Sequence, residues 1–510
     1  MSRLLGGALL GVDGFAVEVE VRISSQLPCV EIVGLPEASV RESATRVRAA
    51  ISGIGRTFPG RRVTVNLAPA SLRKGGAGLD LPIAVGILAA EGVFESEELA
   101  HLGLLGELAL DGRLRPVHGA LALTLALRDA GCTRVVVPRA NGAEAALAPG
   151  VEVFAAGGLG EVVSHLGEGE RLQPARPVAR PDGSGGHPDL VDVRGQETPK
   201  RALEIAAAGG HGMFLRGAPG CGKTMLARRL PSVLPELDFD EALEVTLIHS
   251  AAGLVSEGAP VKWLRPFRAP HHSASAAGLL GGGNPPRPGE ISLAHRGVLF
   301  LDELPEFDRR SLAALRQVLE ERQIVIARAR HSCVFPAHFQ LVAAANPCPC
   351  GWLGSEQRDC RCDEGRVARY QERISGPLID RIDLLVAVRA VPWQQLDSSS
   401  TGDSSGEVAA RIAHARTAQR RRAPPGTRAA PLNADLPDAL LDTSVAATPE
   451  ARQLLGRAVD RLRLSARSAR RALKVARTIA DLAGEPRTGP RAVAEALSFR
   501  DDGANSFSRL

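Results

Sequence analysis

The octapeptide Gly217-Ala-Pro-Gly-Cys-Gly-Lys-Thr224 decides the fold of this chain, because it fits the phosphate-binding pattern G-x-x-x-x-G-K-[ST]. Residues 212–216 before it predict a buried strand, and residues 225–230 after it predict the start of a helix. Glycines let the loop's backbone N–H groups close on phosphate oxygens at the N-terminus of that helix. Lys223 is expected to reach the β- and γ-phosphates of ATP, and Thr224 to bind Mg²⁺. The predicted ATP-binding residues are Gly217, Ala218, Pro219, Gly220, Cys221, Gly222, Lys223 and Thr224.

A second motif, Gly297-Val-Leu-Phe-Leu-Asp302-Glu303, predicts a central strand that ends in two carboxylates. Asp302 is expected to complete the Mg²⁺ shell, and Glu303 to polarise the attacking water as the catalytic base. A solvated acidic turn is the alternative, which the order of the two motifs along the chain disfavours. Together the motifs predict an ATP hydrolase.

Three further polar residues fit the same chemistry. Asn346 ends a predicted strand at residues 339–345, and its amide is expected to orient the lytic water and sense the γ-phosphate. A plain Asn-Pro turn is the alternative there. Arg381 is the candidate arginine finger for a neighbouring subunit's nucleotide, and Arg467 the candidate sensor of its own subunit's nucleotide. Surface ion pairs remain the alternative for both, because the chain is rich in arginine.

The composition is that of an ordinary globular protein. The 510 residues predict roughly three domains, with 44% apolar and 23% charged residues and a net charge of only +5. Only five of the 62 basic residues are lysine, which GC-rich codon usage explains, so diffuse arginine content is no evidence for DNA binding. Aromatic residues, at 3%, are too scarce for a base-stacking surface.

The apolar runs are too short to cross a membrane. Residues 4–12 faintly resemble a leader segment but lack its flanking signals. A cytoplasmic protein without a membrane partner is therefore expected.

Two composition breaks, at residues 167–189 and 394–406, predict linkers. The first segment, 1–166, mixes predicted strands at 15–23, 62–67 and 134–138 with helices at 39–52, 82–91 and 120–130. In the second segment, 190–393, strands alternate with helices, which predicts a parallel sheet. The third, 407–510, is nearly all helical by periodicity. The predicted fold class is therefore α/β and multidomain.

Four cysteines lie within fifteen residues, as Cys348-Pro-Cys350 and Cys360-Arg-Cys362. Tetrahedral Zn²⁺ binds four thiolates, so this insertion at residues 348–362 predicts a structural zinc site, although C-x-C pairs are tighter than the usual C-x₂-C. Unligated or redox-sensitive thiols are the alternative. The remaining cysteines are scattered and are expected to be small buried residues: Cys29, Cys132, Cys221 and Cys333.

Eight further short motifs are spread along the chain: Val30-Glu-Ile-Val-Gly-Leu-Pro36, Arg41-Glu-Ser43, Val65-Asn-Leu-Ala-Pro-Ala70, Asp80-Leu-Pro-Ile-Ala84, Asp192-Val-Arg-Gly-Gln196, Phe267-Arg-Ala-Pro-His-His272, Pro288-Gly-Glu-Ile-Ser-Leu-Ala-His295 and Leu304-Pro-Glu-Phe307. Through these motifs the chain resembles the YifB/ComM group of magnesium-chelatase-like AAA+ ATPases almost from end to end. This resemblance is the basis of the expectations that follow. It implies a ChlI-type N-terminal domain, an AAA+ core and a C-terminal helical lid, assembled into a hexamer. It also implies that Asn346, Arg381 and Arg467 are sensor 1, arginine finger and sensor 2.

The family's N-terminal domain is similar to the Lon protease domain, an α+β fold of the ribosomal protein S5 domain 2-like type. Residues 106–119 match its strand–turn–helix. Where Lon carries its nucleophilic serine this chain has Gly78, and where Lon carries its lysine it has Leu121. A Ser–Lys protease needs both groups, so no peptidase activity is expected.

Residues 321–335 predict two strands with a basic tip of Arg328, Arg330 and His331. In the resembled clade such a hairpin projects into the central pore, and its cations would grip DNA phosphates without reading sequence. A solvated hairpin is the alternative. Residues 278–284 look like the family's second pore insertion.

The family resemblance implies an ATP-driven DNA helicase or branch-migration translocase of homologous recombination or natural transformation. Its expected partners are single-stranded or branched DNA, further copies of the chain, and recombination proteins. The alternative is a protein- or cofactor-remodelling ATPase similar to the magnesium-chelatase motor subunit.

Overall fold

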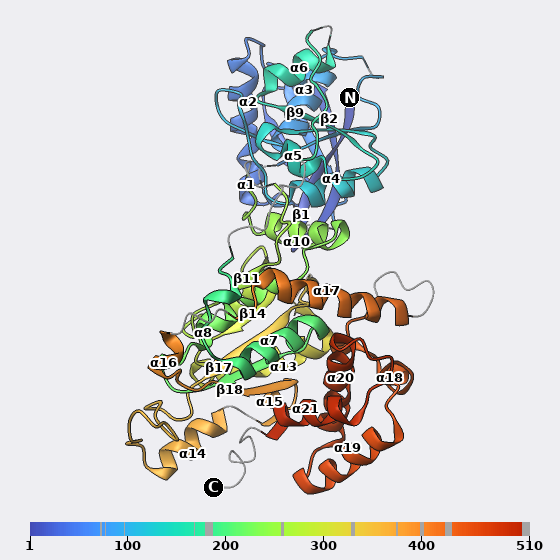
Figure 1. The fold of residues 1–510 in the computed structure, drawn as a ribbon. Helices are drawn as coiled ribbons and strands as arrows, with labels where there is room; N and C mark the ends of the chain where they lie inside the picture. The colour runs from blue at the N-terminus through green and yellow to red at the C-terminus, as the bar shows by residue number, and fades with distance from the viewer. Residues whose placement is uncertain are drawn as a thin grey trace.

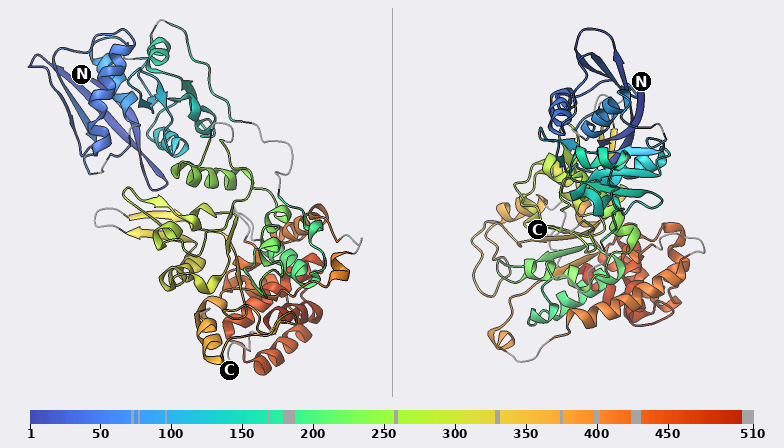
Figure 2. Two further views of the ribbon diagram at one scale, coloured as in Figure 1. Left: turned by 90° about the vertical axis from the view of Figure 1, so that its left-hand side faces the viewer. Right: turned by 90° about the horizontal axis from the view of Figure 1, so that it is seen from above.

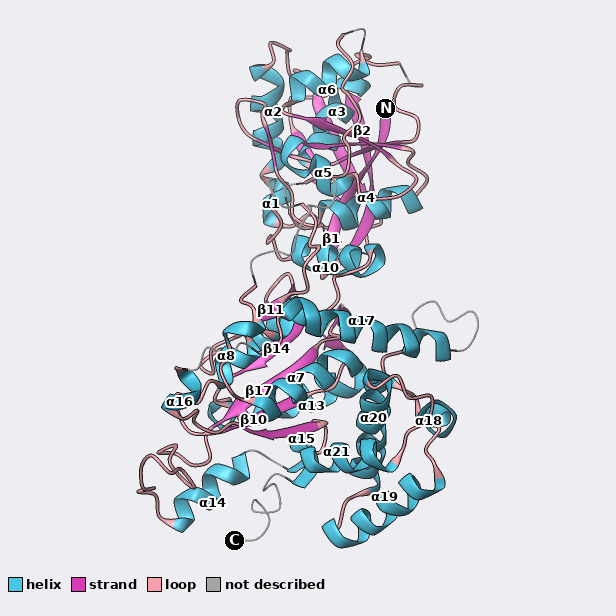
Figure 3. Ribbon diagram, viewed as in Figure 1, coloured by secondary structure: helices cyan, strands magenta, loops and turns pink. Residues whose placement is uncertain are grey.

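The computed structural model describes residues 1–71, 74–76, 78–95, 97–167, 169–178, 187–256, 260–327, 332–373, 376–397, 402–423 and 431–501. The chain forms an N-terminal α/β part, a central part built on a parallel sheet, and a C-terminal helical part (Figure 1). Figure 3 shows the strands of the central sheet running between covering helices, while α17 to α21 gather beside them.

The N-terminal part is organised around a mixed sheet whose described strands run in the order β3-β4-β2-β1-β5-β8-β9. Apolar and polar residues alternate along β2, so that Val17, Val19 and Val21 face the core. Helix α3 is apolar nearly all round and is buried beside this sheet. The elements are β1 (Ser2–Leu10), β2 (Asp13–Ser24), β3 (Val30–Val33), α1 (Ala38–Arg41), α2 (Ser43–Gly53), β4 (Arg62–Ala68), α3 (Asp80–Ala90), β5 (Leu102–Leu104), β6 (Glu107–Leu108), β7 (Leu114–Arg115), α4 (Ala120–Asp129), β8 (Arg134–Pro138), α5 (Gly142–Ala145), β9 (Glu152–Ala156) and α6 (Leu159–Leu166).

The strands and helices predicted for this part are confirmed, except that the helix expected at 39–52 is divided at Glu42. The run at residues 4–12, which faintly resembles a leader, forms β1 and the turn into β2 instead. Two of its glycines are closely packed, because a Cβ on Gly6 or Gly7 would press on leucines of the core.

The central sheet has the described order β11-β14-β17-β10-β18, and all its pairings are parallel. Its inner strands are continuous apolar runs, as expected where helices cover both faces. The strands predicted at the first three motifs are confirmed as β10, β14 and β17. This part comprises α7 (Glu197–Gly209), β10 (Met213–Arg216), α8 (Lys223–Ala227), α9 (Leu230–Val233), α10 (Phe239–Ala251), β11 (Phe267–Arg268), α11 (Ala276–Leu280), β12 (Gly281–Gly282), β13 (Arg287–Pro288), α12 (Glu290–Leu293), β14 (Val298–Leu301), α13 (Arg309–Glu321), β15 (Gln323–Ala327), β16 (Ser332–Pro336), β17 (Gln340–Ala345), α14 (Glu364–Arg373), α15 (Gly376–Ile379), β18 (Leu384–Ala387) and α16 (Trp393–Leu396).

The C-terminal part packs directly on the central one, because α17 and α20 share a buried core with α7. Helix α17 begins at Ser405, inside the stretch predicted as a linker, and Ser404 with Glu407 forms a capping box at its start. Its helices are α17 (Ser405–Arg422), α18 (Asp438–Val445), α19 (Pro449–Leu462), α20 (Ala466–Leu482) and α21 (Pro490–Asp501).

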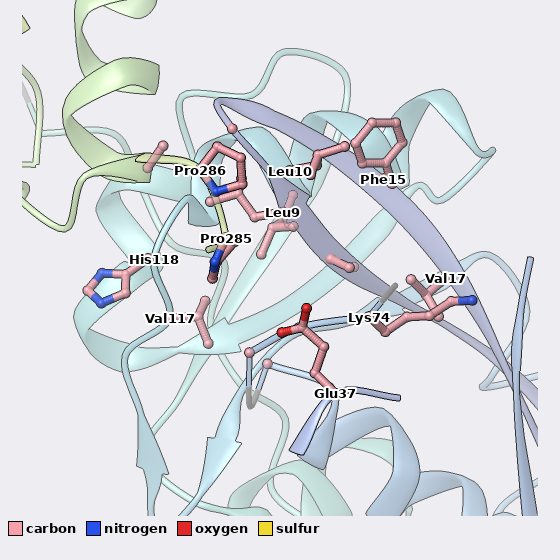
Figure 4. A pocket seen from close by; sticks show the side chains of 18 of the residues that line it. Leu9, Leu10, Phe15, Val17, Glu37, Lys74, Val117, His118, Pro285 and Pro286 are labelled. Atoms are coloured by element: carbon pink, nitrogen blue, oxygen red, sulfur yellow. The ribbon is translucent and has the colours of Figure 1, made fainter. Parts of the chain in front are cut away.

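Among the described residues, the contacts between the N-terminal and central parts include three places. Leu121 of α4 packs with Val245 of α10, and the turn between β1 and β2 places Val12 in one apolar cluster with Phe335. The left view of Figure 2 shows the yellow β15–β16 hairpin lying beneath that turn. Thirdly, Pro285 and Pro286 enter a cavity of about 620 Å³ that the N-terminal part forms (Figure 4).

Within the described part of the chain, no helix is both long and apolar enough to span a bilayer.

Candidate nucleotide site and metal centre

The P-loop joins β10, which ends at Arg216, to α8, which begins at Lys223. Gly222 has a φ of +98°, a conformation that side chains other than glycine's rarely adopt. A Cβ on Gly217 would lie 2.2 Å from the carbonyl oxygen of Val388, next to β18. The predicted strand–loop–helix is thus present, and at two of its glycine positions a side chain would be sterically disfavoured.

Lys223 points back into its own loop. Its Nζ donates to the carbonyl oxygens of Gly217, at 2.8 Å, and Ala218, at 3.0 Å, and to Oδ1 of Asn346 at 3.0 Å. Only 8% of Lys223 is exposed, so three oxygens satisfy an almost buried ammonium group. The structure therefore brings Asn346 to the P-loop lysine, as a role in sensing the γ-phosphate requires.

Thr224 and Asp302 also meet. The Thr224 hydroxyl donates to Oδ2 of Asp302 at 2.8 Å, across the edge where β10 and β14 end. A hydroxyl and a carboxylate at a P-loop form the usual protein ligand pair for the Mg²⁺ of a bound nucleotide. These two predicted ligands are therefore adjacent and oriented toward each other.

Glu303 adopts a left-handed conformation, with φ of +51°, directly after β14. Backbone strain of this kind persists where the surrounding structure holds it, often at functional sites. Its Oε2 lies 3.4 Å from Nδ1 of His272, and about half of its side chain is exposed. Sequence reasoning named His272 only within a family motif and did not pair it with Glu303, because nothing local signals that contact.

Arg381 and Arg467 share one carboxylate. Both guanidinium groups contact Oε1 of Glu320 at the end of α13, with Arg381 at 2.8 Å. Arg471 fixes this corner from α20, since its Nη1 donates to the Arg381 carbonyl at 2.7 Å and to Asp383 at 2.6 Å. The two predicted arginines therefore lie side by side although they are far apart in the sequence.

The location of the two arginines bears on which subunit's nucleotide they would serve. Arg381 precedes β18, so it lies at the N-terminal edge of a parallel sheet whose P-loop lies at the opposite edge. A strand of four residues separates the edges by about 13 Å. Arg467, held on Glu320 beside Arg381, is therefore across the sheet from the P-loop of its own chain rather than next to it.

The four cysteines of the insertion converge. The sulfur of Cys348 lies 3.4 Å from that of Cys350 and 3.6 Å from that of Cys360, and Cys362 completes a set whose sulfurs all lie within 4.8 Å of one another. Four thiolates at about 2.3 Å from a tetrahedral Zn²⁺ would be separated by about 3.8 Å. The donor set and its spacing fit a metal ion of this kind.

The other residues singled out in the sequence lie between β15 and β16 and in the N-terminal part. Arg328, Arg330 and His331 lie outside the described residues, between β15 and β16, which pair antiparallel as predicted. Gly78 lines the cavity of Figure 4, while Leu121 is buried against α10. Lys74 lines that cavity too, but its Nζ donates to the carbonyl oxygens of Gly34 and Pro69.

A P-loop, an acidic strand end and an amide-bearing strand end on one edge of a parallel sheet define a P-loop ATPase module of the AAA+ type. Sequence comparison is more specific. The family profiles "Subunit ChlI of Mg-chelatase", "Magnesium chelatase, subunit ChlI" and "Magnesium chelatase, subunit ChlI C-terminal" match residues 19–141, 189–396 and 402–500.

Full-length relatives complete the comparison. The chain is 44% identical to an uncharacterised protein of Mycobacterium tuberculosis over 99% of both chains. It is 42% identical to competence protein ComM of Haemophilus influenzae and to the uncharacterised protein YifB of Escherichia coli, over 97% of this chain and 96% of each relative. The chain belongs to the YifB/ComM family of magnesium-chelatase-like proteins.

Proposed function

We propose that this protein is an ATP-hydrolysing hexameric motor that translocates along DNA, as a helicase or branch-migration enzyme of homologous recombination or natural transformation. The observation that carries the ATPase step is the meeting of Lys223 with Asn346 beside the pair Thr224 and Asp302. The DNA step is supported by the relative named as a competence protein and by the basic tip predicted for the β15–β16 hairpin.

Each residue around the P-loop is proposed to have its own role in ATP hydrolysis. Lys223 and the P-loop N–H groups hold the β- and γ-phosphates, while Thr224 and Asp302 would hold a Mg²⁺ ion, which would offset phosphate charge. Glu303 accepts the proton of the attacking water, and Asn346 orients that water against the γ-phosphate.

The pair of arginines favours a shared active site. Arg381 and Arg467 lie across the sheet from their own P-loop, so we propose that both reach the nucleotide of the neighbouring subunit. Guanidinium groups delivered in this way stabilise charge on the transferring phosphoryl group. An assembly in which each subunit supplies the next is head-to-tail, and we propose that it closes into a ring of six subunits.

The four-cysteine centre is proposed to bind a structural Zn²⁺, because its donors are all sulfur and their spacing suits a tetrahedron. The N-terminal part is proposed to have no peptidase activity. At the positions matched to the Lon dyad it has Gly78 and Leu121, and Lys74 is engaged by carbonyl oxygens.

The alternative is a protein- or cofactor-remodelling ATPase, favoured by the magnesium-chelatase profiles that match all three parts. The ATPase rate of the purified protein, with and without single-stranded or branched DNA, separates the two. Stimulation together with retardation of DNA at low salt supports the translocase. Hydrolysis without either effect supports the alternative, and a protein that does not hydrolyse ATP refutes both.

A further inference from the structure

The four-cysteine insertion starts directly beside the γ-phosphate sensor, since Cys348 follows Asn346 by two residues at the end of β17. Its first turn is closed by a hydrogen bond of 2.9 Å from the Gly351 N–H to the Cys348 carbonyl. Gly351 has φ of +86°, and a Cβ there would lie 2.6 Å from the ring of Pro219. The turn that holds the first two sulfurs therefore packs against the P-loop itself.

Helix α14, which follows the last cysteine by two residues, returns to the same peptide. Gln371 donates from Nε2 to the carbonyl of Pro347 at 3.3 Å, in a buried position. Tyr370, the single tyrosine of the sequence, is 7% exposed. Burial raises its pKa above the usual range, and a hydrogen bond from the Asn346 backbone offsets only part of that rise. The backbone of Asn346 and Pro347 is thus held by two neighbouring side chains of α14.

The stretch that leads from the first cysteines to α14 has little packing of its own. From Pro349 to Arg366 the described side chains are exposed or half-buried, so this stretch has no apolar core of its own. Helix α14 has only ten residues, of which Val367, Tyr370 and Gln371 are buried, so a helix of this length depends on the packing at these three positions. Arg373 reaches Oε2 of Glu306 at 3.5 Å, three residues after Glu303, which links the helix to the second motif as well.

We propose that a zinc ion bound by the four cysteines holds Asn346 in position against Lys223, so that ATP hydrolysis depends on an ion that does not touch the nucleotide. Closing the loop with four bonds fixes the start of α14, and α14 then fixes the sensor peptide. The cysteines, Tyr370 and Gln371 are positioning residues, because they act through Asn346. This inference rests on the proposed ATPase activity.

The experiment compares the full-length protein with the double variant Cys360→Ser/Cys362→Ser and with Cys29→Ser as the control. Cys29 lies outside the cluster and is exposed, whereas the sequence predicted a buried residue there. Elemental analysis is expected to find about one zinc per chain in the wild type and the control, and none in the double variant. Fluorescent ADP should still bind the double variant with unchanged affinity, because the P-loop is intact. Its kcat should fall about tenfold or more while KM changes little.

Two further proteins keep the test decisive if the double variant does not fold. Cys360→His retains a zinc ligand and should restore both the ion and kcat. Tyr370→Phe should keep the ion and the melting temperature but lower kcat severalfold, which a merely structural role would not do. Two results would overturn this proposal. One is hydrolysis at the wild-type rate by a zinc-free, folded variant, and the other is an unchanged kcat in Tyr370→Phe. A wild type that binds zinc but does not hydrolyse ATP refutes the proposed function instead, because zinc content and ADP binding are read separately.

Discussion

Lys223 donates a hydrogen bond of 3.0 Å to Asn346, which joins the P-loop to the end of a strand 123 residues further along the chain. Asn346 directly follows β17, and Lys223 begins α8 at the end of the loop that leaves β10, the strand next to β17 in the sheet. The contact places the Asn346 carboxamide beside the ammonium group of Lys223, which is expected to bind the γ-phosphate. Each step of the proposed chemistry is built around this pair.

Replacing Asn346 by alanine is expected to separate binding from hydrolysis. ADP affinity should hold, because Lys223 keeps its two carbonyl partners, while kcat for ATP should fall about 10²-fold with the loss of one positioned donor. Lys223→Ala is the matched comparison and should lose nucleotide binding altogether. Equilibrium titration with fluorescent nucleotides and steady-state kinetics measure the two effects, and an Asn346→Ala enzyme with wild-type kcat would contradict the sensor role.

Glu303→Gln is expected to keep nucleotide binding and hexamers but to lose turnover by about 10²-fold or more, because an amide does not accept the proton of the attacking water. Size-exclusion chromatography with ATP and single-turnover hydrolysis provide the measurements. Rapid hydrolysis by this variant would refute the assignment of the base.

His272→Ala is expected to raise the basal ATPase rate severalfold and to weaken stimulation by DNA. The reason is that the imidazole occupies Oε2 of Glu303, the oxygen that must be free to receive a proton. His271→Ala is the control, since His271 bonds Ser273 instead. An unchanged basal ATPase rate in His272→Ala would show that this contact does not slow hydrolysis.

Mixed assemblies test where Arg467 acts. Lys223→Ala and Arg467→Ala subunits should each be inactive alone, yet mixing them should restore part of the ATPase rate. In a mixed ring, an intact P-loop of one subunit meets the intact Arg467 of its neighbour. If Arg467 served its own nucleotide, no interface in the mixture would be complete and the rate would stay at the background of either variant.

Acid is expected to destabilise the fold through His249 on α10. Burial lowers the pKa of His249 to about 4, although its hydrogen bond to the Leu293 carbonyl, 3.0 Å from Nε2, opposes the shift. Between pH 6.5 and 4 the imidazole is protonated in the unfolded chain but not in the folded protein. The free energy of unfolding therefore decreases as the pH is lowered, by up to about 1.4 kcal/mol per pH unit. Above pH 6.5 this dependence is absent.

Chemical denaturation at pH 7, 6 and 5 measures that slope. His249→Gln should flatten it, whereas His414→Gln, at an exposed position of α17, should leave it unchanged. An identical slope in all three proteins would show that another group is responsible.

The sequence by itself determined the candidate nucleotide site and the sheet that carries it. The P-loop is contiguous, and Asp302 and Asn346 each follow an apolar run, so local patterns identify all three. Parallel strands then bring their carboxyl ends to one edge, which is why the site could be assembled without coordinates. The same holds for the four cysteines, whose spacing keeps them together in any compact loop.

Only the tertiary structure decided which residues act on that site from a distance. The contacts of His272 with Glu303, of Arg467 with the carboxylate that Arg381 binds, and of Tyr370 with the Asn346 backbone have no local signature. Each depends on how helices and loops pack on the sheet, and packing is settled by shape and burial over the whole molecule rather than by neighbours in the chain. For the same reason the sequence suggested a sensor for the chain's own nucleotide, whereas the fold places Arg467 at the far edge of the sheet.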